Sequence, residues 1–352
     1  MRLVALSFLL SAVLLTAGED PFEPPTGLQD FARVHTINQV GTPAKVTSLV
    51  KAFFTPVEEG GLGLIYDNAY TRTLPEAWRD RKANCLTLTA LYVSACRAIG
   101  LDAWYGESVR ISRWRREGSI IRYERHIVAV VPNGAMGQDL VADFLPEVRR
   151  GVPMVVHLDQ SRVLALFHSN RAVELMEAAQ LEEAFRSAQV SIHTDPGSGV
   201  GWNILGVVQR HLGLDTEAEC SFRKALDVDP KDGAPCGNLE DLLRAQGRQS
   251  EAQVYRDRGM EIRKRDPFFN AFLAEEAMQG SHWPEAEKHI KVAIRLLPQE
   301  PDFYLIQARV ALAQGFRKDA IRALEKARRW SAPEMRARWD SKLALLKGEK
   351  PA

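Results

Sequence analysis

The sequence has no excess of charge of either sign. Its 352 residues include 46 Lys and Arg against 45 Asp and Glu, a formal net charge of +1. Without a broad basic field, the composition gives no reason to expect a nucleic-acid partner or an anionic membrane surface. Hydrophobic residues make up 45% and charged residues 26%, as is ordinary for a soluble globular protein, and the length predicts about two domains.

Cysteine is scarce, and none of the four cysteines has metal-ligand spacing. Neither a CxxC motif nor a Cys/His cluster is present, so the sequence indicates no metal and no other cofactor. Cys85 and Cys96 are eleven residues apart; on one helix they would lie about 16 Å apart, too far for a disulfide. Cys220 and Cys236 could meet across adjacent helices, and the sequence leaves that pairing open.

The one long apolar run is at the start of the chain. Arg2 is followed by apolar residues from Leu3 to Thr16, and then by the small residues Ala17 and Gly18. This order is typical of a signal peptide, and the run is shorter than the ~20 residues of a membrane-spanning helix. We therefore expect residues 1–18 to be removed, and the mature protein to be secreted or periplasmic without a stable membrane anchor.

The second half of the chain is repetitive. Asp195-Pro196 recurs 34 residues later as Asp229-Pro230. The unit between them has aromatic, small and turn residues at the spacing of two antiparallel helices: Trp202, Leu205, Gly206, Gly213, Ala218, Phe222 and Ala225. This pattern matches the tetratricopeptide repeat. It predicts an all-α solenoid of about five units over residues 161–333, with a longer second helix in the third unit, and a capping helix and tail over 334–352.

In a tetratricopeptide stack the first helix of each pair lines a groove. The polar residues that we expect on those helices are His168, Arg171, Asn203, Gln209, Asn238 and Asn270. The resemblance implies that this groove binds a protein or peptide. Each of these side chains, taken singly, is also compatible with an ordinary solvated position.

Residues 19–160 have mixed periodicity and predict a separate α+β domain. Helices are expected at Thr47–Phe54, at Leu74–Trp78 and from Cys85 to Ile99; strands at Ala103–Val109, Ile120–Val131 and Leu140–Phe144; and a hairpin connection at 110–118. Asn84 is a strong N-cap residue, and so Cys85 would stand in the first turn of its helix. The free N–H groups and the dipole of that turn stabilise a thiolate.

Two further residues complete a possible nucleophilic site. His126 lies in the second predicted strand and Asp143 in the third, and facing residues of neighbouring antiparallel strands lie within about 5.5 Å. An imidazole beside a thiol can accept its proton, and a carboxylate on the other ring nitrogen orients that imidazole.

The order of these elements resembles the transglutaminase-like (papain-related) superfamily. The residues that carry the resemblance are Asn84-Cys85-Leu86, Ala98 to Ala103, Arg125 to Val128 and Ala142-Asp143. The resemblance implies that Cys85 is the nucleophile, His126 the general base and acid, and Asp143 the orienting carboxylate. The Cys85 backbone N–H and the Trp78 indole N–H are candidate donors to an oxyanion.

The sequence therefore predicts an exported cysteine protease, amidase or acyl transferase whose repeats recruit a protein. Hydrolysis and acyl transfer stay open, because the triad does not choose the acceptor. The alternative is a non-catalytic scaffold or assembly protein that binds its partners through the tetratricopeptide repeats.

Overall fold

The computed structural model describes residues 20–117, 120–133, 137–144, 155–331 and 336–348. The predicted signal peptide lies outside these residues. The chain forms two compact units that divide between Ala103 and Trp104. The sheet thus groups with the helical repeats, whereas we expected it to group with the preceding helices in a domain ending at residue 160. Contact between β3 (Trp104–Glu117) and α11 (Pro267–Gln279) contributes to that grouping.

The first unit is built around one buried helix. Its elements are α1 (Leu28–Thr36), α2 (Thr42–Phe54), η1 (Val57–Glu59), β1 (Ile65–Tyr66), α3 (Leu74–Asp80), β2 (Lys82–Ala83) and α4 (Cys85–Ala98). Helix α4 is apolar on nearly every side, as expected of a helix enclosed by its neighbours. The Tyr92 hydroxyl, for example, donates to the Val46 carbonyl at 3.0 Å, and its ring meets Phe53 edge-on.

The second unit begins with a four-stranded antiparallel sheet in the order β5-β4-β3-β6. Strands β4, β5 and β6 are Ile120–Val131, Leu140–Ala142 and Val155–Leu158. The expected hairpin connection at 110–118 is wrong, since β3 continues to Glu117 and pairs with β4, with a shift of register between Ser108 and Arg113. Ladder hydrogen bonds come from the backbone, and so an arginine-rich sequence can extend a strand.

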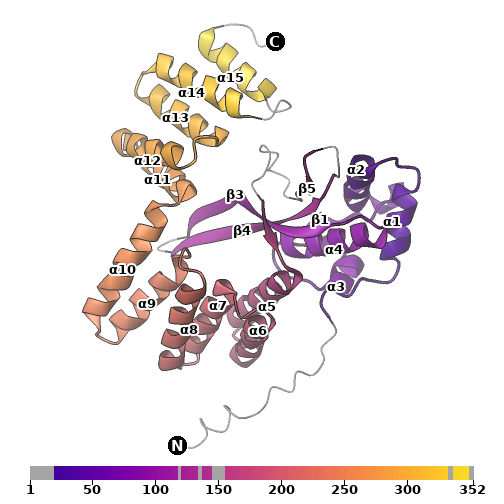
Figure 1. Ribbon diagram of the computed structural model, residues 1–352. Coiled ribbons are helices and arrows are strands. Elements are labelled where there is room, and N and C mark those ends of the chain that lie inside the picture. Colours follow the sequence, from indigo (N-terminus) through magenta and orange to yellow (C-terminus); the bar gives the residue numbers. More distant parts are fainter. Residues whose placement is uncertain (1–19, 118–119, 134–136, 145–154, 332–335, 349–352) are drawn as a thin grey trace, which may run out of the picture. The chain divides into compact units, whose positions relative to one another are not determined.

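Helix pairs follow the sheet. They are α5 (Gln160–Glu177) with α6 (Leu181–Thr194), α7 (Gly199–His211) with α8 (Asp215–Val228), α9 (Ala234–Ala245) with α10 (Gln249–Lys264), α11 with α12 (Trp283–Leu296), and α13 (Pro301–Ala313) with α14 (Arg317–Trp330). Figure 1 shows these antiparallel pairs and the last helix, α15 (Arg336–Lys347). Helix α10 has 16 residues and α8 has 14. The sequence predicted this longer second helix for the third repeat.

The turns inside the pairs repeat with a constant period. The backbone has positive φ at residues 179, 213, 247, 281 and 315, which are 34 residues apart throughout. Glycine occupies three of these positions, where the left-handed conformation is free of side-chain strain. Within residues 160–331, all of which the structure describes, the five pairs therefore have the length and turn geometry of a tetratricopeptide-type array.

Close packing inside a pair depends on Gly206 of α7. The Phe222 ring of α8 covers this glycine, and a Cβ atom placed on Gly206 would lie 2.6 Å from the ring. Phe222 itself is fully buried. A side chain at position 206 therefore cannot be added without displacing the ring or separating the two helices.

Gly206→Ala is expected to lower the free energy of unfolding by about 1–3 kcal/mol, because the added methyl group overpacks the α7–α8 contact. Gly237→Ala is the matched control: it also lies within a helix, but no atom approaches its added Cβ within 4 Å. This change should stabilise the array by about 0.5–1 kcal/mol through helix propensity. Urea titrations followed by circular dichroism compare the two; equal effects would contradict the packing argument.

Candidate functional site

Cys85 is the first residue of α4, as predicted. The Asn84 side chain caps the helix by accepting from the Thr87 N–H at 3.0 Å. Its amide group also donates to the Thr71 hydroxyl at 2.9 Å, which fixes the buried cap in place. The half-buried Cys85 therefore lies in the first turn of a capped helix, close to the unpaired backbone N–H groups of that turn.

His126 and Asp143 are joined in the second unit. The His126 Nε2 and Asp143 Oδ1 atoms are 2.7 Å apart, and the His126 side chain is buried. Asp143 was expected within a strand over Leu140–Phe144. The observed strand β5 ends at Ala142, and so Asp143 is the first residue after it. Ala142, the residue before Asp143, pairs with Ala129 of β4, the strand that carries His126. The carboxylate engages Nε2, and a proton transfer from a thiol would therefore use the other ring nitrogen, Nδ1.

The described contacts do not test the complete triad, because Cys85 belongs to the first unit and the His126–Asp143 pair to the second. The triad stays a prediction. Trp78, the predicted oxyanion donor, lies on α3 with its ring edge-on to Phe31 at 5.5 Å. Its role as a donor is likewise untested.

The sequence analysis did not identify Ser108. This buried residue lies on β3 directly opposite His126 on β4, and its hydroxyl has no hydrogen-bond partner among the described residues. A buried polar group without a partner is uncommon, and facing side chains in a sheet are close neighbours. Only the strand register reveals the position of Ser108, and the sequence pattern did not predict that register.

All four cysteines are free thiols, including Cys220 and Cys236, for which pairing was left open. Burial raises the pKa of Cys96 to about 12 and also raises that of Cys236. Both are therefore poor nucleophiles at neutral pH. Cys220 is exposed on α8 and provides an internal reference for the reactivity of Cys85.

The predicted groove residues separate into two groups. Gln209 and Asn270 are buried: Gln209 accepts from the Ser221 hydroxyl at 2.6 Å, and Asn270 donates to two backbone carbonyls. We leave both out of the binding surface because their side chains hold helices together. The others are half-buried, and two of them meet across successive units, since Asn238 donates to Asn203 at 2.8 Å.

His168 and Arg171 lie on α5, the first helix of the array. The His168 carbonyl accepts from the Ser187 hydroxyl at 3.0 Å, and Arg171 pairs with Glu174 at 2.7 Å. Both contacts lie within the first helix pair, α5 and α6. These two residues are thus compatible with a groove position, and a side-chain bond between successive helix pairs is the one that joins Asn203 to Asn238.

A charge network links α8 to the start of α10. Glu219 accepts hydrogen bonds from Arg248 and from Arg223, each at 2.6 Å. The hydrogen bond from Arg248 is the main reason that the pKa of Glu219 lies below its ordinary value of 4.5; partial burial opposes the shift. Since the carboxyl pKa is lower in the folded state, the network contributes fully above about pH 4.5 and is lost as pH falls through the folded pKa.

Glu219→Gln is expected to lower the free energy of unfolding by about 1 kcal/mol at pH 7, and the difference from the unchanged protein should shrink near pH 3.5. Urea titrations at the two pH values measure this. Glu183→Gln, in an exposed pair with Arg186, should have little effect at either pH. A Glu219→Gln effect that does not depend on pH would contradict the linkage.

The described residues contain no group of three or more His, Cys, Asp and Glu side chains arranged to hold a metal ion. Among the helices in the described part of the chain, none has the length and apolar character needed to span a bilayer.

Comparisons with known proteins identify no family for this chain. No protein-family model matches the chain, and no curated protein does. Among solved structures, the repeats resemble YrrB, a tetratricopeptide protein with an unusual peptide-binding site, at 22% identity over 52% of this chain and 91% of YrrB, with a TM-score of 0.26. They also resemble PilW, a type IV pilus biogenesis factor, at 19% identity over 55% of this chain and 89% of PilW, with a TM-score of 0.29.

A third similar structure is PilF of Pseudomonas aeruginosa, at 16% identity over 53% of this chain and 85% of that one, with a TM-score of 0.29. Because all three TM-scores are low, we base the assignment of tetratricopeptide-type repeats on this chain's own 34-residue period and paired helices. The comparisons give no support to the resemblance of the N-terminal half to the transglutaminase-like superfamily.

Proposed function

We propose that this chain is a scaffold or recruitment protein that binds a protein or peptide along its repeat array. The observation that carries the proposal is the side-chain bond between Asn203 and Asn238. Asn203 is the fifth residue of α7 and Asn238 the fifth of α9, so the first helices of two consecutive units present joined amides. These two joined amides, which we call the asparagine strip, extend across two consecutive helix pairs, as an extended ligand requires.

The two amides are complementary to a peptide backbone. The bond between them uses one N–H of Asn238 and the carbonyl of Asn203. The Asn203 amide N–H groups and the Asn238 carbonyl remain as donor and acceptor. A bound peptide offers the matching carbonyl and N–H from its backbone. Both side chains are half-buried, so little side-chain freedom remains to be lost on binding.

Selection from a displayed library of random linear peptides against the full chain tests this proposal. We expect enriched peptides that bind the unchanged protein and are depleted in selections against Asn203→Ala/Asn238→Ala. Failure to enrich any sequence, or enrichment that the double substitution leaves intact, would contradict binding at this strip.

A second candidate function is favoured by the 2.7 Å contact between His126 and Asp143. In this function Cys85 is the nucleophile of an amide-bond enzyme. His126 Nδ1 takes the thiol proton, and the thiolate attacks a carbonyl carbon. The amine leaves with the proton held by His126, and a thioester to Cys85 remains. Water then completes hydrolysis, or a second amine completes acyl transfer, and the thiol is restored.

The two candidates are compatible, since an array that binds a protein can deliver it to a cysteine site. The enzyme would act outside the cytoplasm if residues 1–18 are removed on export, and the intact mass of the mature protein tests that removal. The catalytic proposal additionally requires Cys85 to reach the His126–Asp143 pair.

Alkylation of the reduced protein by iodoacetamide, read by peptide mass spectrometry over a range of pH, tests the cysteine site. Cys85 should react well below the free-thiol pKa of about 8.5, whereas exposed Cys220 should follow an ordinary profile. His126→Ala should move the Cys85 profile up to that of Cys220. Identical profiles for the two thiols in the unchanged protein would remove the catalytic candidate and leave partner binding unaffected.

A further inference from the structure

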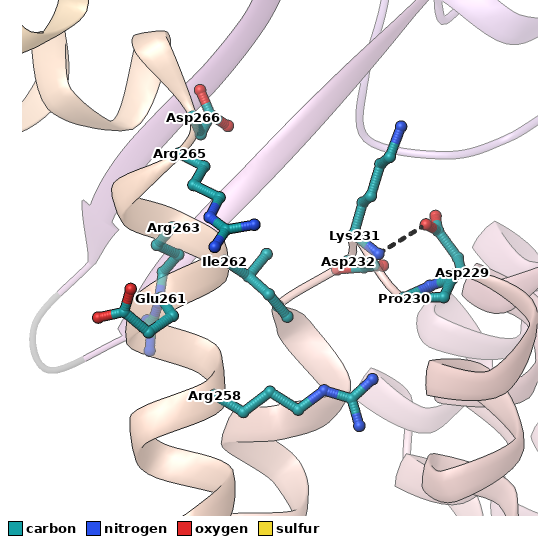
Figure 2. Close-up of a pocket in the computed structure, with 11 residues that line it drawn as sticks. Asp229, Pro230, Lys231, Asp232, Arg258, Glu261, Ile262, Arg263, Arg265 and Asp266 are labelled. Carbon is teal, nitrogen blue, oxygen red and sulfur yellow. Dashed lines mark hydrogen bonds between the residues drawn. The ribbon is translucent and has the colours of Figure 1, made fainter.

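The described part of the array contains a cavity of about 650 Å³ between two neighbouring helix pairs, α7–α8 and α9–α10. One wall is the connection from α8 to α9, residues 229–233, and the other is the C-terminal half of α10 with Asp266 (Figure 2). Its volume is within the range of ligand-binding pockets in proteins. None of its lining residues is among the groove residues considered above.

One face of α10 supplies the polar and apolar groups of the cavity. Arg258 and Ile262 of α10 and Arg265, the C-cap residue of that helix, are spaced i, i+4 and i+7, and so they lie on the same side of the helix. Figure 2 shows all three side chains extending from α10 toward the α8–α9 connection. The two arginines are about 10 Å apart along the helix axis, with the apolar isoleucine between them. Lys231 adds a third cation from the opposite wall.

The side chains of these three cations, Arg258, Arg265 and Lys231, are not used in hydrogen bonds or ion pairs within the described residues, although Arg265 interacts electrostatically with Glu261. Arginines elsewhere in the array are commonly paired, as Arg248 is with Glu219 and Glu251. The fourth cation of the cavity, Arg263, is engaged by the Gly259 carbonyl and stacks over the Phe269 ring.

The carboxylates around the cavity already hold other groups. Asp229 accepts from the Lys231 N–H, Asp232 from the Ala234 N–H, and Asp266 from the N–H groups at the start of α11. Glu261 pairs with Lys264 at 2.7 Å. These acids therefore shape the loops and helix ends, although Arg258 and Arg265 stay available to a ligand. The dipole at the C-terminal end of α10 accounts for a cation at residue 265, but not for Arg258, two turns earlier.

We propose that this cavity binds an acidic peptide segment of the partner, with Arg258 and Arg265 each gripping a carboxylate and Ile262 contacting the apolar part between them. Guanidinium groups pair with carboxylates through two parallel hydrogen bonds. In an extended peptide, alternate residues lie on one side about 7 Å apart, a spacing that the long arginine side chains can span. The proposal rests on partner binding by the array and adds the chemistry of the partner.

Fluorescence anisotropy with a labelled peptide of alternating Glu and Ala, acetylated and amidated so that it has no terminal charge, tests the site on the full chain. The same peptide with Gln in place of Glu is the ligand control. Arg258→Gln/Arg265→Gln should weaken binding of the Glu peptide by about tenfold or more. Arg295→Gln/Arg336→Gln changes the net charge equally at two exposed arginines outside the cavity, one on α12 and one on α15, and should leave binding unchanged.

Three outcomes would overturn the proposal: no binding of the Glu peptide to the unchanged protein, equal binding of the Gln peptide, or equal loss in both double variants. Competition by a single-stranded oligonucleotide that likewise depends on Arg258 and Arg265 would assign the cavity to a different class of ligand. The display selection separates this failure from that of the proposed function. If the selected peptides depend on Asn203 and Asn238 but not on the two arginines, the proposal of partner binding stands. The proposal of an acidic-peptide site in the cavity is then contradicted.

Discussion

Replacing Asp143 by asparagine is expected to slow acylation of Cys85 by about 100-fold or more. The carboxylate accepts from His126 Nε2 at 2.7 Å and would stabilise the imidazolium that forms when His126 takes the thiol proton. An asparagine of the same shape lacks the negative charge and can present an N–H to the ring, which favours the wrong tautomer. The burst of nitrophenolate from p-nitrophenyl acetate, measured by stopped-flow absorbance, reports this acylation without knowledge of the natural substrate.

Asp139→Asn is the matched control for this change. Asp139 is exposed just before β5, and its side chain forms no hydrogen bond or ion pair with the described residues, so the same change of charge there should alter the burst rate by less than about twofold. Cys85→Ala should abolish the burst. An unchanged burst rate in Asp143→Asn, with the fold intact by circular dichroism, would remove Asp143 from any mechanism at Cys85.

Phe222→Ala is expected to have the largest effect on stability, a loss of about 3–5 kcal/mol in the free energy of unfolding. The ring is fully buried between α7, α8 and α9, against Gly206 and a cluster that includes Leu239 and Leu243. Its removal leaves a cavity where successive units meet. Because each unit of a repeat array is stabilised chiefly by its neighbours, the loss should affect the array beyond the α7–α8 pair.

Phe316→Ala provides the comparison, since this side chain is 56% exposed at the start of α14. It should change the free energy of unfolding by no more than about 0.5 kcal/mol. Urea titration of the helical circular dichroism signal measures both variants. Similar midpoints for Phe222→Ala and the unchanged protein would mean that α7 and α8 are not held together by this ring.

The sequence predicted the repeats well because their signals are local. A 34-residue period, a glycine at a turn and alanines three or four apart are all properties of neighbouring residues, and they place the helix pairs and the longer α10. The position of Cys85 at a capped helix start was predictable for the same reason, since Asn84 caps its own helix. The His126–Asp143 contact followed from strand order alone.

Features that depend on distant partners could not be predicted. Strand β6 is four residues long, and only its pairing with β3 defines it. The extension of β3 to Glu117 depends in the same way on backbone pairing with β4, which an arginine-rich sequence does not reveal. Ser108 became a neighbour of His126 through that register. Gln209 and Asn270 were predicted in the groove because helical spacing does not show which polar side chains bond inward.

The most direct test of the central claim, partner binding along the array, is the affinity of a library-selected peptide for the full chain and for Asn203→Ala/Asn238→Ala, measured by isothermal titration calorimetry. We predict that the double substitution weakens binding about tenfold or more, since two amide contacts to the peptide backbone are lost. Asn170→Ala, at an exposed position on α5, should leave the affinity unchanged. Equal affinity of the double variant and the unchanged protein would contradict the account.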